Sequence, residues 1–529
     1  MRKQLLILAV LALTCTELTA SKKMDIKTIA SGYFSAKTIQ GIDPIPGTDQ
    51  YARISDDGKQ IIQNSFKTGK QTAVLFDVNK TIGEKITKFD GYILSPKGDK
   101  FLIQTNTEKM YRHSFKADYY IYTIKSTKLE RLSDGGKQQV PLWSPDGNQI
   151  AFVRDNNLFL IKLLYDNAES QVTKDGKFNE TINGIPDWVN EEEFGNNRSF
   201  CFNGDGTMLC WIKYDESKVK SYSLQMFKGK HPTRNEYSTY PGEYSYKYPK
   251  AGEDNSVVSA WSFDIKRTND PHRIIVYTMN RHQDELNLYA VNPRSTTAQL
   301  LIKEKADCYI QEQAMADIII GRSTILLPSD RDGYMQIYLY NQNGTMIRKI
   351  GDGKHDITSI YGYNEENGDV YYQAAALNPH DRQVFVSHKN GKVERLTDQE
   401  GWNSAIFSGD YQFFINTWSN YNTPYTFTLR SQKGKVLSVL LDNSKLKDKM
   451  AEYGWSKREP FTFTTSEGIS LDGWMLKPNN FDPSHKYPVI LFQYSGPGSQ
   501  QVVDSWKAGS LGNGGAFDQY LVQQGFIVV

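Results

Sequence analysis

The chain has 529 residues, a formal net charge of +2 and an aromatic content of 12%. This length is too great for one hydrophobic core, so two domains are expected. The near-neutral charge argues against nucleic acid as the main partner, which would require a clustered basic surface. The aromatic residues, which include 32 tyrosines, favour β-rich structure.

Residues 1–20 have the pattern of a signal peptide. Two basic residues precede an apolar run from Leu5 to Leu13, which is too short to cross a membrane as a helix, and small or polar residues then lead to Ala20. We therefore expect an exported protein, periplasmic or at the surface of a bacterial cell, with no transmembrane span. A lipid anchor on Cys15 is an alternative that the preceding residues match poorly.

From about residue 50 to 440, a loose unit of turn, short apolar strand, turn and strand repeats. The clearest turns begin at positions 55, 95, 144 and 203, so that they lie 40, 49 and 59 residues apart. Each ends on a glycine at its fourth position, as a type I turn prefers. The spacing is that of a four-stranded blade with variable loops. We predict a mostly β fold, a seven- to eight-bladed β-propeller over residues 25–450, with a pair of β-sandwiches as the alternative.

The cysteines allow two interpretations. Removal of the signal peptide would leave Cys201, Cys210 and Cys308. Cys201 and Cys210 flank a turn and can face each other across a hairpin, either as a disulfide or as two free thiols. None of the cysteines has metal-ligand spacing, so we expect no metal site and no cofactor.

A different pattern begins at residue 455, after a polar helix predicted over 443–453. A hairpin is predicted over 461–476. A continuous apolar strand then runs over 487–493, as is typical of sheets covered on both faces. A helix over 517–524 and another apolar strand over 525–529 follow. We interpret residues 455–529 as the N-terminal part of an α/β-hydrolase domain, truncated because the sequence stops on its most hydrophobic strand.

The stretch from Asp187 to Gly195 contains three consecutive glutamates among bulky apolar neighbours. Such a run alone is most often a solvated helix start, because acids are favoured near a helix N-terminus. Neighbouring carboxylates also repel each other, at separations of ~4–6 Å. If the fold holds them in a partly buried position, a cation between them, such as the α-amino group of a peptide, therefore stabilises the arrangement.

Together with Tyr111–Ser114 and Tyr494–Pro497, this stretch resembles the dipeptidyl peptidase IV family of serine exopeptidases, especially its bacteroidete members. The similarity runs from about residue 25 to the last residue and includes Phe152–Asn157 and Tyr246–Glu253. The Asp-Trp-Val-x-Glu-Glu-Glu and Tyr-x-Gly-Pro motifs are specific in combination. The resemblance implies an eight-bladed propeller joined to an α/β-hydrolase domain, with the active site in the cavity between them.

The resemblance also implies roles for particular residues. Glu192 and Glu193 match the glutamates that bind the substrate's N-terminal ammonium, so that only the second peptide bond reaches the nucleophile. Arg112 matches the arginine directed at the carbonyl between the first two substrate residues, and Tyr494 matches the tyrosine of the oxyanion hole. The implied partners are peptides with a free N-terminus and a second copy of the chain in a homodimer.

Two departures from the family pattern affect the glutamate stretch. The family usually has tyrosine at the position of Asn190, so the packing that orients the glutamates is expected to differ here. Residues 196–202 also lack the usual Trp-Ser-Pro-like start of the next blade.

The sequence contains no Gly-x-Ser-x-Gly elbow, which a nucleophilic serine of this fold requires before its Asp and His partners. We therefore expect the triad and the S1 pocket beyond residue 529, and no hydrolysis by this chain alone. The parent enzyme is expected to release Xaa-Pro or Xaa-Ala dipeptides by acylation and deacylation of a serine. The alternatives are an exported propeller binding protein with a vestigial hydrolase segment, and a related prolyl endopeptidase or acylaminoacyl peptidase, which lacks the paired glutamates.

Overall fold

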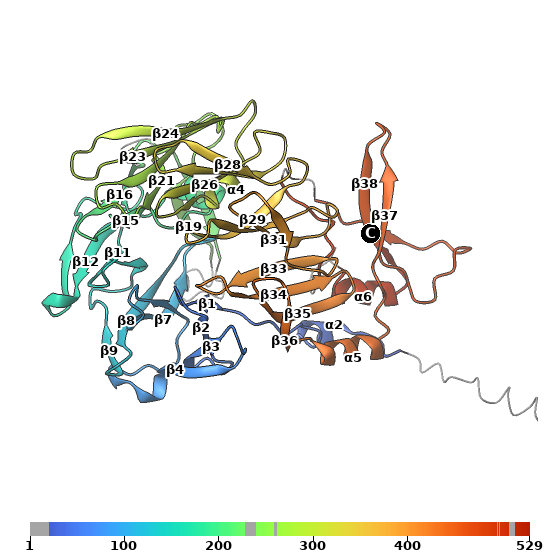
Figure 1. Ribbon diagram of the computed structural model, residues 1–529. Helices are drawn as coiled ribbons and strands as arrows, with labels where there is room; N and C mark the ends of the chain where they lie inside the picture. The colour runs from blue at the N-terminus through green and yellow to red at the C-terminus, as the bar shows by residue number, and fades with distance from the viewer. Residues whose placement is uncertain (1–20, 228–239, 259–261, 495, 497, 507–513) are drawn as a thin grey trace, which may run out of the picture.

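The computed structural model describes residues 21–529 except 228–239, 259–261, 495, 497 and 507–513, so the expected signal peptide lies outside the described residues. Sheets are arranged around a central axis as the blades of a ring, and a smaller C-terminal part lies at one side of it (Figure 1). The eight blades confirm the predicted β-propeller.

The first three blades are each one sheet of consecutive strands. Blade 1 contains β1 (Asp43–Pro44), β2 (Gln50–Ile54), β3 (Gln60–Ser65) and β4 (Gln71–Asp77). Blade 2 contains β5 (Ile82–Gly83), β6 (Gly91–Leu94), β7 (Lys100–Lys109), β8 (Phe115–Thr123) and β9 (Lys128–Arg131). Blade 3 contains β10 (Gln139–Trp143), β11 (Gln149–Arg154), β12 (Asn157–Lys162) and β13 (Ala168–Gln171).

Blades 5 to 8 follow the same plan. Blade 5 contains β21 (Ser262–Arg267), β22 (Ile274–Met279), β23 (Glu285–Val291) and β24 (Ala298–Lys305), and blade 6 contains β25 (Ile319–Ile320), β26 (Thr324–Ser329), β27 (Gln336–Asn341) and β28 (Met346–Ile350). Blade 7 contains β29 (Ile357–Asn364), β30 (Asp369–Ala374), β31 (Gln383–Ser387) and β32 (Val393–Arg395). Blade 8 contains β33 (Trp402–Phe407), β34 (Phe413–Asn420), β35 (Thr423–Ser431) and β36 (Val436–Leu441).

Blade 4 is divided into three small sheets. The first pairs β14 (Thr181–Asn183), β17 (Lys213–Asp215) and β20 (Val257–Val258); the second pairs β15 (Phe200–Phe202) with β16 (Leu209–Trp211); the third pairs β18 (Ser221–Met226) with β19 (Gly242–Lys247). A short helix, α3 (Trp188–Phe194), is inserted between β14 and β15. The blade therefore contributes a helix to the ring between two of its own sheets.

Blade 3 shows why the continuous apolar strands pack as they do. Successive side chains of a strand point to opposite faces. On β11, Ile150 and Phe152 pack toward blade 2, whereas Ala151 and Val153 pack toward blade 4. All four are fully buried. A strand with both faces covered is apolar throughout, as the sequence of β11 is.

The predicted turns are confirmed. The amides of Gly58, Gly98, Gly147 and Gly206 donate to the carbonyl three residues earlier at 2.9, 2.9, 2.9 and 3.1 Å. These glycines have φ angles between 66° and 76°, where a side chain would be strained. The turns after β6, β10 and β15 join the inner strand of a blade to the next strand, and the turn at 55–58 joins β2 to β3.

The ring closes between blade 1 and blade 8, and each of these blades is formed by one contiguous segment. Among the described residues, no strand is exchanged between the two. The junction is packed by an apolar cluster that includes Tyr51 and Phe66 from blade 1 with Ile415, Phe427 and Leu429 from blade 8. Side-chain packing therefore seals this junction.

The C-terminal part begins with α5 (Ser444–Glu452) and contains a hairpin of β37 (Glu459–Thr464) and β38 (Ser470–Met475), then β39 (Val489–Ile490), α6 (Ala516–Gln523) and β40 (Ile527–Val528). The parallel pairing of β39 with β40 is that of an α/β fold. The remaining short elements are helices α2 (Ile26–Ala30) and α4 (Glu312–Ala316), and 3-10 turns η1 (Val78–Lys80) and η2 (Leu163–Tyr165). The ring contacts this part through hydrogen bonds such as Arg382 to Gln500, at 2.6 Å.

The buried strand predicted over residues 487–493 is wrong in length and burial. Only Val489 and Ile490 pair with a neighbour, and Val489 and Leu491 are 58% and 72% exposed. Among the described residues, β39 has one neighbouring strand, so one of its edges has no partner.

Cys201 and Cys210 are direct partners across β15 and β16, as the hairpin interpretation requires. Both are free thiols in the structure, and burial raises the pKa of each. Within the described ranges there is no helix long and apolar enough to cross a membrane. The same ranges contain no cluster of acidic, His and Cys side chains that could hold a metal ion.

Candidate functional site

The glutamate run lies on α3, a helix that is fixed at both ends. Asp187 is the N-cap: its Oδ1 accepts the Asn190 amide at 3.0 Å and the Asn190 side chain at 2.7 Å, and its Oδ2 accepts the Ser256 hydroxyl at 2.6 Å. Gly195 ends the helix in the left-handed conformation at φ 63°. Asn190, where the family usually has tyrosine, therefore takes part in capping the helix.

Glu191 is the buried member of the run, with 8% exposure. Its Oε1 accepts the backbone amides of His113 at 2.9 Å and Ser114 at 2.7 Å. These bonds join α3 to the loop that follows β7 in blade 2. The loop that carries Arg112 is therefore held against the glutamate helix, a contact that the sequence did not predict.

Arg112 and Glu192 form an ion pair, with 2.6 Å between Nε and Oε2. Glu192 Oε2 is buried and has no hydrogen-bond partner. Its contact with Arg112 is therefore an ion pair without the alignment of a hydrogen bond. The Arg112 side chain is 63% exposed, and that of Glu192 only 19%. Tyr111 and Glu192 raise the pKa of Arg112. Among the described residues, the exposed carboxylate of Glu193 has no hydrogen bond or ion pair.

An aromatic cluster supports the first turn of α3. The Trp188 ring lies 4.2 Å from the Tyr248 ring and 6.3 Å from those of Tyr246 and Tyr111. Burial and Glu192 raise the pKa of Tyr111. The cluster joins the segments of blades 2 and 4 that carry the resemblance motifs, which explains why Tyr111 and Tyr246–Tyr248 occur with the glutamate run.

Tyr494 lies apart from this group, in the loop after β39, with 61% exposure. In the part of the chain that the structure describes, no hydrogen bond or ion pair joins it to Arg112, Glu192 or Glu193. The predicted site residues therefore form two groups, one on the ring and one on the C-terminal part.

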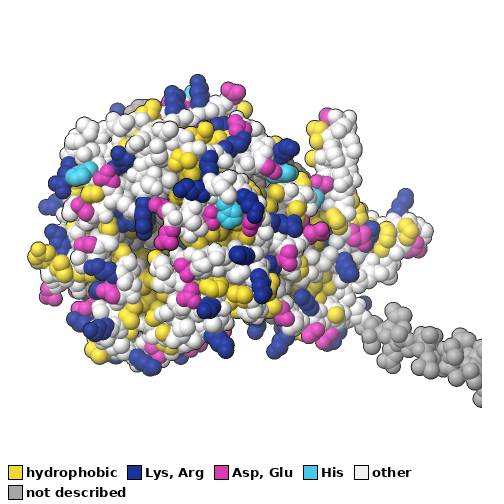
Figure 2. Space-filling view, viewed as in Figure 1, with side chains coloured by type: hydrophobic (Ala, Val, Ile, Leu, Met, Phe, Trp, Pro, Cys, Tyr) yellow, Lys and Arg dark blue, Asp and Glu magenta, His cyan; other side chains and the backbone are white. Residues whose placement is uncertain are grey.

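A cavity of about 840 Å³ lies between the ring and the C-terminal part. Its lining includes Ile357 and Trp402, at the beginnings of β29 and β33, together with Arg382, Gln500 and Trp506. Neither α3 nor Tyr494 lines it. On the face of the molecule in Figure 2, acidic and basic side chains are interspersed over the ring.

The described residues define a protein that joins an eight-bladed propeller to a C-terminal segment with a parallel strand pair and a helix. The family model of the dipeptidyl peptidase IV (DPP IV) N-terminal region matches residues 95–270 and 261–425. The chain belongs to the dipeptidyl peptidase IV family.

Relatives and solved structures agree with this assignment. The chain is 27% identical over 499 residues to a probable dipeptidyl peptidase 4 of Aspergillus flavus, a match that covers 87% of this chain and 63% of the relative. The crystal structure of Porphyromonas gingivalis dipeptidyl peptidase 4 is 33% identical, with a TM-score of 0.90, over 96% of this chain and 74% of that one.

A putative dipeptidyl aminopeptidase IV from Bacteroides ovatus shares the fold at 20% identity, with a TM-score of 0.71 over 96% of this chain and 74% of that one. The chain thus spans less than two thirds of the length of the Aspergillus relative.

Proposed function

We propose that this chain binds the free amino terminus of a peptide on α3, as the substrate-anchoring part of a dipeptidyl peptidase. The observation that carries the proposal is the arrangement of Glu192 and Glu193. One carboxylate is held by Arg112, and its neighbour is exposed and without a partner among the described residues. An ammonium ion that contacts both would relieve the repulsion between them.

The same geometry would fix the distance between the amino terminus of the peptide and the bond that is cleaved. Each charge-assisted contact to the ammonium would contribute about 1.5–3 kcal/mol. A chain fixed at its amino terminus presents only its second peptide bond to a nucleophile at a constant distance. The proposed products are therefore dipeptides, of the Xaa-Pro or Xaa-Ala type. Arg112 would also contact the carbonyl between the first two residues of the substrate.

Tyr494 is proposed to donate a hydrogen bond to the tetrahedral intermediate, a contact worth about 2.7–4 kcal/mol in comparable sites. Its place in a loop after a parallel strand supports this role, because such loops lie where ligands bind in α/β folds. The sequence contains no Gly-x-Ser-x-Gly nucleophile, so the 529-residue chain is expected to leave a Gly-Pro chromogenic substrate intact. Measurable turnover by the purified chain would contradict this proposal.

The amino-terminal anchor is tested by calorimetric titration with Gly-Pro-Leu and with its N-acetyl form. The free peptide should bind and the acetylated one should not. Glu192→Gln and Glu193→Gln should each weaken binding by about 2–5 kcal/mol. Glu366→Gln, which changes the same charge in the exposed β29–β30 turn, is the matched control and should leave affinity unchanged. Equal binding of the acetylated and free peptides would exclude the anchor.

The alternatives give different results in the same titration. An acylaminoacyl peptidase or prolyl endopeptidase would retain its affinity in the Glu192→Gln variant. A propeller binding protein would also bind the free peptide more tightly than the acetylated one. It would not need Tyr494, so Tyr494→Phe would leave its peptide affinity unchanged. In an enzyme that combines this segment with a nucleophile, the same change should lower kcat by roughly 100-fold or more.

Export to the periplasm or cell surface and assembly as a homodimer complete the proposal. The signal-peptide pattern of residues 1–20 supports export, and the family resemblance supports the homodimer. Fractionation of cells that express the chain and light scattering on the purified protein test them. A cytoplasmic product, or a monomer at micromolar concentration, would contradict the respective part.

A further inference from the structure

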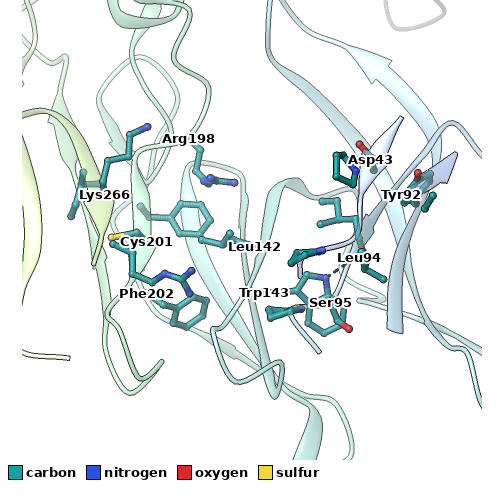
Figure 3. A pocket seen from close by; sticks show the side chains of 18 of the residues that line it. Asp43, Tyr92, Leu94, Ser95, Leu142, Trp143, Arg198, Cys201, Phe202 and Lys266 are labelled. Atoms are coloured by element: carbon teal, nitrogen blue, oxygen red, sulfur yellow. Dashed lines mark hydrogen bonds between the residues drawn. The ribbon is translucent and has the colours of Figure 1, made fainter. Parts of the chain in front are cut away.

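A second cavity, of about 560 Å³, lies within the ring and away from the C-terminal part (Figure 3). It is lined by the inner strands of five successive blades, β1, β6, β10, β15 and β21, or by the residues that follow them. The cavity between the ring and the C-terminal part is instead lined by the beginnings of β29 and β33. Because the inner strands of a propeller run in the same direction, the two cavities lie toward opposite ends of the central channel.

One wall of the ring cavity carries cationic groups from blades 4 and 5. Arg198 precedes β15, and Lys266 and Arg267 end β21. Figure 3 shows the Arg198 side chain extending over the space between the labelled walls. The Arg198 and Arg267 side chains are both exposed, so a ligand can reach their guanidinium groups. The wall therefore presents accessible positive charge to the cavity.

The acid on this strand neutralises Lys266 but not the two arginines. Asp264 is the carboxylate on the same strand, and its Oδ2 lies 2.8 Å from Lys266 Nζ, while its Oδ1 accepts the Ile265 amide at 2.7 Å. Both oxygens are therefore engaged. Within the described part of the chain, the guanidinium groups of Arg198 and Arg267 have no hydrogen bond or ion pair.

The rest of the lining is mainly apolar. The lining includes Phe200, Leu142 and Trp143. In Figure 3, Leu142 lies near Arg198, Trp143 lies near Leu94 and Ser95, and the opposite wall carries Asp43 and Tyr92. A pocket with an apolar wall and a small number of unpaired charged donors suits a ligand with one apolar and one charged end.

We propose that this channel cavity binds a small amphipathic carboxylate, with its carboxylate between Arg198 and Arg267 and its apolar body against Phe200 and Leu142. Guanidinium groups match the geometry of a carboxylate and bind it through charge-assisted hydrogen bonds. The site uses no residue of α3, so it is independent of the amino-terminal anchor.

The probe for this site is N-acetyl-phenylalanine. It has a carboxylate and an aromatic body, but its blocked amine prevents binding through Glu192 and Glu193. In calorimetric titration of the whole chain, we expect saturable binding that the double variant Arg198→Gln, Arg267→Gln weakens by roughly 10-fold or more. Arg294→Gln in the exposed β23–β24 turn is the matched charge control and should bind as the wild type does.

Three further measurements make the proposal falsifiable. Thermal unfolding of the double variant establishes that it is folded, and the Glu192→Gln variant should bind the probe normally even if the amino-terminal anchor proves wrong. Phenethylamine, which has the same aromatic body and the opposite charge, should not bind. Absence of saturable binding by the wild type, or unchanged binding by a folded double variant, would overturn the site. Equally tight, arginine-dependent binding of inorganic phosphate would overturn the assignment of an amphipathic carboxylate.

Discussion

Blades 3 and 4 are neighbours in the ring, yet they are built on different plans. Blade 3 is one four-stranded sheet whose central strand is buried on both faces. Blade 4 is divided into three sheets, and α3 with its glutamate run is inserted between β14 and β15. The regular blade is packed on both faces, and the divided blade carries the glutamates of the candidate site. The comparison suggests that mutations in blade 3 should affect stability and those in blade 4 should affect binding.

The largest effect is expected from Phe152→Ala in blade 3. Phe152 is fully buried and stacks on Phe159 with 5.5 Å between ring centroids. Removing it should lower the free energy of unfolding by about 3–5 kcal/mol, because the cavity cannot collapse completely. Denaturant titration measures this loss. Leu164→Ala, at a site that is 74% exposed, is the control and should change stability by less than about 0.5 kcal/mol.

Glu191 tests whether blade 4 positions the site through its buried carboxylate. Glu191→Ala leaves the amides of His113 and Ser114 without their acceptor, at a cost of about 1–3 kcal/mol in stability. Peptide affinity should fall as well, although Glu191 has no proposed contact with the peptide. Glu191→Gln keeps an acceptor oxygen and should restore much of both properties. If the alanine variant loses stability but keeps full affinity for Gly-Pro-Leu, the positioning role is wrong.

Glu216, also in blade 4, predicts a pH dependence of stability. Burial and the nearby charge of Asp187 raise the pKa of Glu216 from 4.5 to about 7, and Lys247 opposes the shift. The folded protein then holds a proton that the unfolded chain releases, so stability is greatest below pH 4.5 and falls as the pH rises to about 7. Glu216→Gln should remove this dependence.

At pH 8 the glutamine variant should be more stable than the wild type by on the order of 1–2 kcal/mol. Unfolding curves at pH 5 and pH 8 provide the measurement. If the stabilities of the wild type and of the glutamine variant rise by the same amount between pH 5 and pH 8, Glu216 is not the group that titrates.

The smallest effect is expected from Asp187→Ala. Loss of this N-cap should destabilise by about 1 kcal/mol, through frayed hydrogen bonds at the start of α3. Asp187→Asn keeps an acceptor for the Asn190 amide and should cost less. It should also lower the pKa of Glu216, because the neighbouring negative charge is gone. A loss of helix content reports the missing cap, and a shift in the pH midpoint of stability reports the lower pKa of Glu216.

The sequence predicted the regular blades well because their signals are local. A turn such as Ser144–Gly147 needs glycine at a positive φ, and a strand buried on both faces needs an unbroken apolar run. The strand predicted over 487–493 failed for the opposite reason. Its extent depends on which strands lie beside it, and only β40 pairs with it among the described residues.

The candidate site was predicted less completely. Arg112 and Glu192 are 80 positions apart, and only the family resemblance suggested that they meet, as they do. Glu191 escaped prediction because it bonds to backbone amides, which leave no pattern in the side-chain sequence. Arg198 escaped because nothing local distinguishes an arginine in a channel from one at the surface. The functional roles of Arg112, Glu192, Glu193 and Tyr494 stay predictions.

The junction between blades 1 and 8 has a mechanical consequence. A propeller can be locked by a strand from one end of the chain that pairs in the blade formed by the other end, but the described residues of this ring contain no such strand. The apolar contacts that hold it weaken on cooling, because hydrophobic association is largely entropic near room temperature. The junction between blades 1 and 8 should therefore open more readily at low temperature. A circularly permuted chain that begins at any other inter-blade loop should still be able to form the ring.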